Sequence, residues 1–224
     1  MIKFAPEGYP FIFGALFLTI IASIVLLLLR KLGAPRIPMH LAALLLCSSF
    51  IATLFMTFFF RDPERATPAG EGLFVSPADG KVILTKDVYE KEYLKADAKE
   101  ISIFMSPLDV HVNRAPCDGA VAAVRYTPGK FFAAYSDDAA TKNENIAMVL
   151  EGNQGRILVR QVAGFLARRA VCRVKVGDRV RRGERYGIIK FSSRLDVYLP
   201  EDAKITVKVG DKVKAGETVI AKKR

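Results

Sequence analysis

Two long uncharged stretches near the start of the chain constrain its fold most. Residues 10–29 carry no charged side chain, and residues 37–60 carry none either, although they include His40. Each stretch is about 20 residues or longer, which is the length that an α-helix needs to cross a bilayer. A short basic turn containing Gly33 and Pro35 separates them. The sequence therefore predicts a membrane-associated helical hairpin over residues 1–60, followed by a linker over residues 61–72.

The flanking charges leave the orientation of this hairpin open. The basic turn, with Arg30, Lys31 and Arg36, favours a cytoplasmic turn under the positive-inside rule, but the other flank competes with it through Arg61, Arg65 and Lys81. A hairpin that enters only one leaflet is the other alternative. No small-residue cleavage site ends the first apolar stretch, and a second one follows. We therefore do not expect a removable signal peptide.

Residues 73–224 are predicted to form a β-rich domain, because short strand patterns alternate with tight turns. Residues 86–99 are polar and fit either a helix or a long hairpin. The formal net charge of the chain is +11. A basic domain tethered at a bilayer is attracted to anionic lipids. Nucleic acid is the other usual partner of a basic domain, but no nucleic-acid motif is recognisable. The three cysteines lack the spacing of a disulfide framework or a zinc site, so we expect no metal.

Two internal repeats refine the expected fold. Residues 174–184 match residues 207–217, and residues 77–82 match residues 116–121. Each repeat has the pattern of a strand, a turn and a strand, with Gly-Asp or Asp-Gly at the turn. Such hairpins resemble the barrel-sandwich folds of lipoyl and biotinyl carrier domains. The expected fold class is a mainly β (α+β) domain with lipoyl-like hairpin repeats after an N-terminal hydrophobic helical hairpin.

Three polar residues of this domain are candidates for chemistry. Ser192 and Ser193 lie between two strand patterns, where a serine pair is ordinarily a polar turn. His111 is the only histidine of the domain. A lone histidine is more often structural, but an imidazole is suited to moving protons near neutral pH. Asp79 lies in one of the repeated Asp-Gly turns.

The segment FSSRLDVYLP, residues 191–200, resembles the processing site of phosphatidylserine decarboxylases of the short membrane-associated form. The segments MSPLDVHVNRAP, SPADG and PGKF, which begin at residues 105, 76 and 128, resemble other parts of that family. The resemblance implies that the Ser193 hydroxyl attacks the carbonyl of Ser192 and converts the amide to an ester. Elimination then cuts the chain into residues 1–192 and 193–224 and leaves a pyruvoyl group at position 193. The products would be an α/β pair, and further homo-oligomerisation stays open.

The same resemblance implies roles for the other candidates. His111 would deprotonate Ser193 during processing and later reprotonate the decarboxylated carbon. Asp79 would orient the imidazole, as in Ser–His–Asp sites, and a plain turn is its alternative. Arg114 stands where some family members carry a second histidine. Ser192 stands where the family has glycine, so it is either a tolerated variant or one that slows self-cleavage.

The implied reaction is the conversion of phosphatidylserine to phosphatidylethanolamine. The pyruvoyl ketone would condense with the lipid amine, and the adjacent amide carbonyl would accept electrons as CO2 leaves. Arg114, Arg168 and Arg169 are candidates to hold the lipid phosphate by their charge. Phe131 and Phe132 are candidates to line the substrate pocket or contact lipid, and a buried strand is the alternative. The resemblance places the protein at the cell membrane, with its domain on the cytoplasmic side.

A second hypothesis from another class is a non-enzymatic membrane-anchored adaptor built on a lipoyl-like barrel. Such adaptors normally carry a long helical hairpin with heptad repeats, and the sequence shows none. A lipoyl or biotinyl carrier is a third hypothesis, which is disfavoured because neither repeat presents a lysine in the required context.

Overall fold

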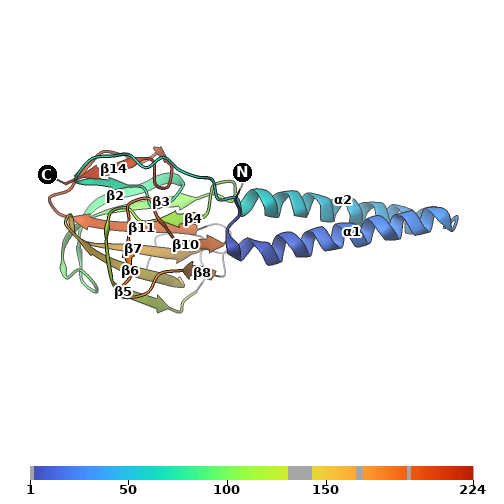
Figure 1. Cartoon of the computed structure of the whole chain (residues 1–224), viewed down its shortest axis with the longest axis horizontal. Coiled ribbons are helices and arrows are strands. Elements are labelled where there is room, and N and C mark those ends of the chain that lie inside the picture. Colours follow the sequence, from blue (N-terminus) through green and yellow to red (C-terminus); the bar gives the residue numbers. More distant parts are fainter. Residues whose placement is uncertain (1–2, 131–142, 165–168, 191–192, 224) are drawn as a thin grey trace. The chain divides into compact units, whose positions relative to one another are not determined.

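The computed structural model describes residues 3–130, 143–164, 169–190 and 193–223. The chain divides into two compact units, Met1–Pro63 and Glu64–Arg224. The first unit contains the helices labelled in Figure 1, and the second contains the strands. Each unit is described by itself below.

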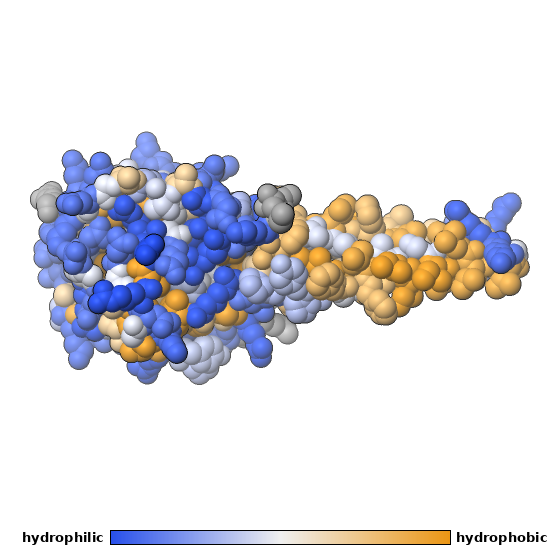
Figure 2. Space-filling model, in the orientation of Figure 1, coloured by the Kyte–Doolittle hydropathy of each residue, from blue (hydrophilic) through white to orange (hydrophobic). Residues whose placement is uncertain are grey.

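The first unit is the helical hairpin that the two uncharged stretches predict. After a 3-10 turn at Pro6–Gly8, helix α1 spans Tyr9–Lys31 and helix α2 spans Arg36–Phe59. Gly33 ends the first helix with a φ of +62°, a conformation that glycine adopts without strain. Most large apolar side chains of both helices are exposed, and Figure 2 shows an almost continuous hydrophobic surface along them. Both helices are long and apolar enough to cross a membrane.

The two helices contact each other through small residues and one polar pair. Ala22, Ala42 and Ser49 are buried, and small side chains let helix backbones approach closely in lipid. The hydroxyl oxygens of Thr19 and Thr53 are 3.1 Å apart across the helix pair. Each hydroxyl also lies within hydrogen-bond distance of a carbonyl one turn earlier in its own helix, so one hydroxyl can donate across the pair while the other donates to its own helix.

The second unit is built on one large antiparallel sheet that curls into a half-barrel. The sheet has eight strands in the order β13-β2-β3-β11-β7-β6-β5-β9. Its strands are β2 (Gly80–Glu90), β3 (Ala96–Met105), β5 (Gly119–Thr127), β6 (Asn145–Gly152), β7 (Gly155–Ala163), β9 (Arg179–Val180), β11 (Ser193–Pro200) and β13 (Lys212–Val213). The ambiguous segment 86–99 is therefore a hairpin between β2 and β3, and Glu90 caps its turn by accepting two backbone N–H bonds at 2.7 Å.

Two three-stranded sheets complete this unit. One is β1-β14-β12, with strands Leu73–Val75, Val219–Lys222 and Lys204–Ile205 in that order. The other is β4-β10-β8, with strands Val112–Arg114, Arg185–Lys190 and Arg169–Cys172 in that order. The mainly β fold expected from the sequence is confirmed.

The sequence repeats correspond to repeated contacts at the two edges of the large sheet. Gly177 donates its N–H to the Val121 carbonyl, and Gly210 donates to the Val82 carbonyl, both at 2.9 Å. Strand β9 then pairs with the start of β5, and β13 pairs with the start of β2. Both glycines have positive φ, +93° and +101°, as the Gly-Asp turns require. The repeats therefore form two equivalent edge units.

Alternation along the central strand β11 divides the domain interior into two sides. Leu195, Val197 and Leu199 belong to the main apolar cluster, together with Ile101 and Ile103 of β3. The intervening residues of β11 face the opposite side, because successive side chains of a strand point to opposite faces. Tyr198 lies there in a smaller apolar cluster with Leu158 and Val149.

Candidate active site

Ser193 is the first residue of β11 and is fully buried. It pairs with Met105 of β3 on one side and with Ala163 of β7 on the other. Its hydroxyl donates to the sulfur of Met105 at 3.2 Å. Ser192 lies outside the described residues, so only the Ser193 side of the predicted cleavage junction is described. A thioether is a weak acceptor, so this contact positions the hydroxyl without removing its proton.

His111 is also fully buried and immediately precedes β4. Its ring nitrogen Nδ1 lies 3.0 Å from the carbonyl oxygen of Asp109. A carbonyl oxygen can only accept, so Nδ1 carries the proton and Nε2 of the neutral ring holds the lone pair. The Asp109 carboxylate in turn accepts the backbone N–H of Ser106 at 2.8 Å, which stabilises the loop that carries the imidazole. The structure therefore sets the tautomer that a proton acceptor at Nε2 needs.

Two sets of contacts bring His111 and Ser193 to the same part of the domain. The backbone carbonyl of His111 accepts the N–H of Ile189, which lies four positions before Ser193 in the chain. Asn113, on the strand that follows His111, points its Nδ2 at the sulfur of Met105 at 3.8 Å. That sulfur is the atom that also contacts the Ser193 hydroxyl. Ser193 therefore contacts the buried cluster of Met105 and Asn113 through its hydroxyl, whereas His111 is connected to it through the backbone, two residues before Asn113.

Gln161 completes this cluster and was not predicted from the sequence. Its Nε2 donates to Asn113 Oδ1 at 2.8 Å and lies 3.4 Å from the Val171 carbonyl. Gln161 is 1% exposed, and its Oε1 has no hydrogen-bond partner among the residues that the structure describes. The donated bond fixes the Asn113 amide with Nδ2 toward Met105. The one signal in the sequence is a glutamine directly before Val162 and Ala163, the apolar residues that end β7.

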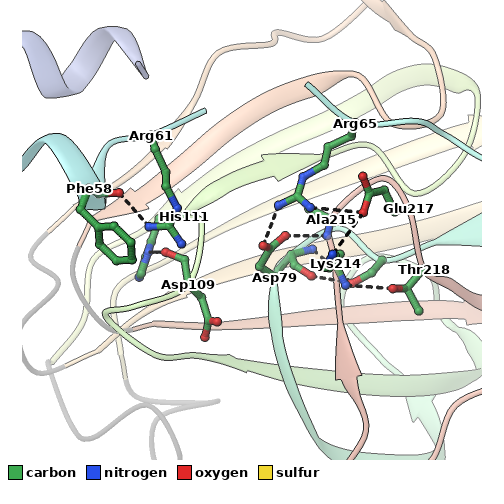
Figure 3. Close-up of polar contacts among 12 residues, drawn as sticks. Phe58, Arg61, Arg65, Asp79, Asp109, His111, Lys214, Ala215, Glu217 and Thr218 are labelled. Carbon is green, nitrogen blue, oxygen red and sulfur yellow. Dashed lines mark hydrogen bonds and ion pairs between the residues drawn. The ribbon is translucent and has the colours of Figure 1, made fainter. Parts of the chain in front are cut away.

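Asp79 has a structural set of contacts. One carboxylate oxygen accepts the Ala215 N–H at 2.8 Å, and the other pairs with Arg65 at 2.7 Å. Figure 3 shows this carboxylate directed at Arg65 and Ala215, while the His111 ring is directed at Asp109. Burial raises the pKa of Asp79, although the Ala215 bond and Arg65 oppose that rise.

The internal repeat explains the Ala215 bond. Asp118, which matches Asp79 in the repeat, accepts the N–H of Arg182 at 2.9 Å, and Arg182 matches Ala215. Both aspartates therefore fasten one edge unit. The pairing with Arg65 is the additional feature at Asp79.

The predicted substrate-binding residues are only partly described. Arg114 is 5% exposed and donates one guanidinium N–H to the Gly183 carbonyl at 2.9 Å. Phe131, Phe132 and Arg168 lie outside the described residues, and Arg169 is the first residue of β8. The ends of their segment are described: Lys130 and Asn143 form a β-bridge, and Asn143 Nδ2 donates to the Ala163 carbonyl at 2.7 Å. Since Ala163 pairs with Ser193, Asn143 is bonded to the strand beside the candidate nucleophile.

A pyruvoyl group at position 193 fits the space that the serine occupies. The group has the same three carbons as serine, and its methyl would take the place of the CH2OH that contacts the Met105 sulfur. The ketone would lie at the end of a strand that is paired on both sides. The Ser193 hydroxyl and the His111 imidazole have the chemistry of a nucleophile and a proton acceptor, and both are fully buried.

Comparisons with known proteins all point to one protein family. The sequence model of the phosphatidylserine decarboxylase family matches residues 52–221. A phosphatidylserine decarboxylase proenzyme of Amoebophilus asiaticus is 41% identical over 223 residues, covering 99% of this chain and 97% of that protein. One of Geobacter sp. strain M21 is 46% identical over 218 residues, covering 96% and 94%. One of Desulfotalea psychrophila is 42% identical over 219 residues, covering 97% and 95%.

Proposed function

This chain belongs to the phosphatidylserine decarboxylase family, and we propose that it converts phosphatidylserine to phosphatidylethanolamine through a pyruvoyl group made from its own Ser193. The observation that carries the proposal is the burial of Ser193 at the start of the central strand, together with the buried His111, whose carbonyl is hydrogen-bonded to Ile189 just upstream of that serine. An ordinary polar turn would leave this serine exposed to water.

Self-processing would use atoms that the chain itself supplies. The Ser193 oxygen attacks the carbonyl carbon of residue 192, the C–N bond breaks, and the peptide becomes an ester with a free amine at residue 193. Loss of the Cα proton of residue 193 expels the carboxylate of residue 192 and cuts the chain. Addition of one water and release of one ammonia then leave a ketone at the new chain end. No oxidant or reductant is consumed in this sequence.

His111 is the proposed proton acceptor for the Ser193 hydroxyl. Its Nδ1–H is committed to the Asp109 carbonyl, so Nε2 has the lone pair that general-base catalysis requires. General acid–base catalysis by a positioned side chain typically contributes about 100-fold to 10,000-fold in rate. Substituting His111 by Gln keeps a polar side chain of similar reach and removes the titratable nitrogen. We expect self-cleavage to slow by that factor.

The ketone, once formed, supplies an electrophile for the lipid amine and an electron sink for loss of CO2. The surrounding residues orient it and keep water out, because Met105, Ala163 and Asn113 are all buried. His111 is the group that we propose returns a proton to the decarboxylated carbon. Arg114, Phe131 and Phe132 remain the proposed contacts for the lipid phosphate and acyl region.

The helical hairpin is the proposed membrane anchor. A diacyl lipid leaves the bilayer at a high free-energy cost, so an enzyme acting on its headgroup gains from residence at the membrane surface. The domain would lie on the cytoplasmic side, where the basic net charge favours anionic lipid. Phosphatidylserine is such a lipid.

Self-cleavage followed in time tests this proposal. The full chain is produced in detergent micelles, and the uncut and cut forms are separated on a denaturing gel while CO2 release from phosphatidylserine is measured. We expect the wild-type chain to be cut and active, and Ser193→Ala to be neither. Thr206→Ala is the matched control, because it removes an exposed hydroxyl elsewhere in the domain.

Ser192 provides the second arm of the test. Glycine reaches backbone conformations that a residue with a Cβ resists, so we expect Ser192→Gly to speed self-cleavage. If the chain remains intact and inactive both as wild type and as Ser192→Gly, the proposed enzymatic function is refuted. The membrane-anchored adaptor would then be the better account.

A further inference from the structure

We propose that the side chain of Arg194 anchors the new chain end after scission and thereby positions the reactive group at residue 193. The inference rests on the proposed function, because it concerns the chain end that self-cleavage creates. Arg194 is a positioning residue here, since it acts through the strand and not by touching the substrate.

Arg194 lies on the side of β11 opposite to Ser193 and makes a dense set of buried contacts. Its Nε pairs with Asp196 Oδ1 at 2.6 Å, and its Nη2 donates to Ser102 Oγ at 2.8 Å. The same Nη2 lies 3.4 Å from Glu100 Oε1. The guanidinium therefore joins β11 to β3 directly beside the residue to be modified.

These charges are almost completely withdrawn from water. Arg194 is 4% exposed, Glu100 is 3% exposed and Asp196 is fully buried. Asp196 Oδ2 has no hydrogen-bond partner within the described parts of the chain. Buried ion pairs often stabilise a fold no better than apolar residues of similar size. A network of this kind therefore calls for a reason other than stability, and fixing one conformation is the role best attested for such groups.

Scission supplies that reason. Before cleavage, residue 193 is covalently linked to the chain on both sides. Strand β10, which ends at Lys190, restrains it from the N-terminal side, and β11 restrains it from the C-terminal side. After cleavage, β11 begins with a free end, and free strand ends fray unless something holds them. A shift of register by one residue would turn every side chain of β11 to the wrong face. Arg194 opposes both movements, because its partners on β3 fit one register only.

Glu100 extends the anchor further into the sheet. Its carboxylate accepts the Tyr198 hydroxyl at 3.3 Å and pairs with the half-exposed Lys86 at 3.1 Å. Tyr198 and Arg194 belong to the same strand, so Glu100 of β3 contacts β11 at two positions. The start of β11 is thus tied to its neighbour independently of the backbone ladder.

Separate measurement of self-cleavage and of turnover tests the inference. The variants are Arg194→Met, Arg194→Lys and the pair Arg194→Met with Asp196→Asn, which also removes the partner charge. Arg156→Met is the matched control, because it removes an exposed arginine that pairs with Glu151 at 3.2 Å. The fraction of cut chain, kcat, KM and hydrogen exchange of the 193–224 fragment are measured for each.

We expect Arg194→Met to be cut at nearly the wild-type rate, because the uncut chain still holds residue 193. Its kcat should fall by about 10-fold to 100-fold with little change in KM, since small misplacements of a reacting group have effects of that size. Arg194→Lys should recover part of kcat. Faster exchange at the start of β11 should appear in the cut form and not in the uncut form.

Three outcomes would overturn the inference. One is an Arg194→Met chain that is cut and turns over like Arg156→Met. Another is a loss of cutting and turnover together in all three Arg194 variants, which marks the network as purely structural. A chain that is never cut, neither as wild type nor as Ser192→Gly, refutes the proposed function, and the anchor with it. If the wild type is cut and active and Arg194→Met behaves like Arg156→Met, only the anchor is refuted.

Discussion

The buried amide pair of Asn113 and Gln161 gives a prediction whose size follows from the structure. Gln161 Nε2 donates to Asn113 Oδ1 at 2.8 Å in a site that water does not reach. Asn113→Leu and Gln161→Met each keep the approximate side-chain volume and remove one member of the pair. We expect each single variant to be destabilised and the double variant to be destabilised less than the two singles combined.

The magnitude depends on which polar groups are left without partners. Asn113→Leu leaves the Gln161 amide with the Val171 carbonyl at 3.4 Å as its remaining acceptor. A buried polar group left unsatisfied costs about 1–3 kcal/mol, whereas replacing both partners by apolar groups of similar shape is nearly neutral. The cycle should therefore show a coupling free energy of about 2 kcal/mol between the two positions.

Urea unfolding of the full chain in micelles measures this coupling. All four chains carry Ser193→Ala, so that each remains uncut and their unfolding is comparable. The chain has no tryptophan, so far-ultraviolet circular dichroism follows the loss of sheet. A change of 2 kcal/mol moves the urea midpoint by about 1 M for a domain of this size. Gln154→Met, which loses a bond to the Leu73 carbonyl nearer the surface, is the control.

Additive effects would refute this reasoning. If the double variant loses the sum of the single losses to within about 0.5 kcal/mol, the two amides do not act as a pair. The buried cluster beside Ser193 would then have to be described differently.

Three other predictions concern the domain around the site. Burial raises the pKa of Cys117 to about 12, so between pH 9 and 12 the unfolded chain releases this proton and the folded chain keeps it. The free energy of unfolding should fall across that range by up to about 1.4 kcal/mol per pH unit. Cys117→Ala should reduce this fall. An equal fall in that variant would show that Cys117 is not the group responsible. Gly80→Ala would place a Cβ against a backbone carbonyl of β3 and should cost about 3 kcal/mol or more. Gly177→Ala, with open space at its Cβ, should cost about 1–2 kcal/mol in thermal unfolding, and equal losses would refute the steric argument. Asp79→Asn keeps an acceptor for its backbone partner and loses the Arg65 pair, so we expect lower thermal stability with self-cleavage still proceeding. A folded Asp79→Asn chain that is hardly cut would instead assign Asp79 to orienting the imidazole.

The broad fold follows from local patterns in the sequence. The two uncharged stretches have the length and apolarity of membrane helices, and the structure has helices at Tyr9–Lys31 and Arg36–Phe59. The repeated Gly-Asp turns are fixed by backbone conformations that glycine allows, and the structure shows them with positive φ. Such features depend on a few neighbouring residues, so single-sequence reasoning reaches them.

The segment 86–99 shows where local patterns become ambiguous. Its polar residues fit a helix or a hairpin equally well, and the choice depends on pairing with residues further along the chain. Glu90 decides the turn by accepting backbone N–H groups, which is a contact that a sequence pattern does not reveal.

The polar environment of the site was not predictable for the same reason. Ser193 and His111 were recognised through the family resemblance, but Met105, Asn113 and Gln161 come from three separate strands. Their meeting depends on sheet pairing between residues far apart in the chain. Asp79 illustrates the converse, because its repeated turn explains its backbone bond and only the fold brings Arg65 to it.

The mass of the small chain tests the central claim most directly. The account predicts a fragment of residues 193–224 whose mass is lower than that of the same fragment with a serine N-terminus by one ammonia, and which resists stepwise N-terminal sequencing. An intact chain of 224 residues in wild type and in Ser192→Gly, or a fragment that begins with an unmodified serine, would contradict it.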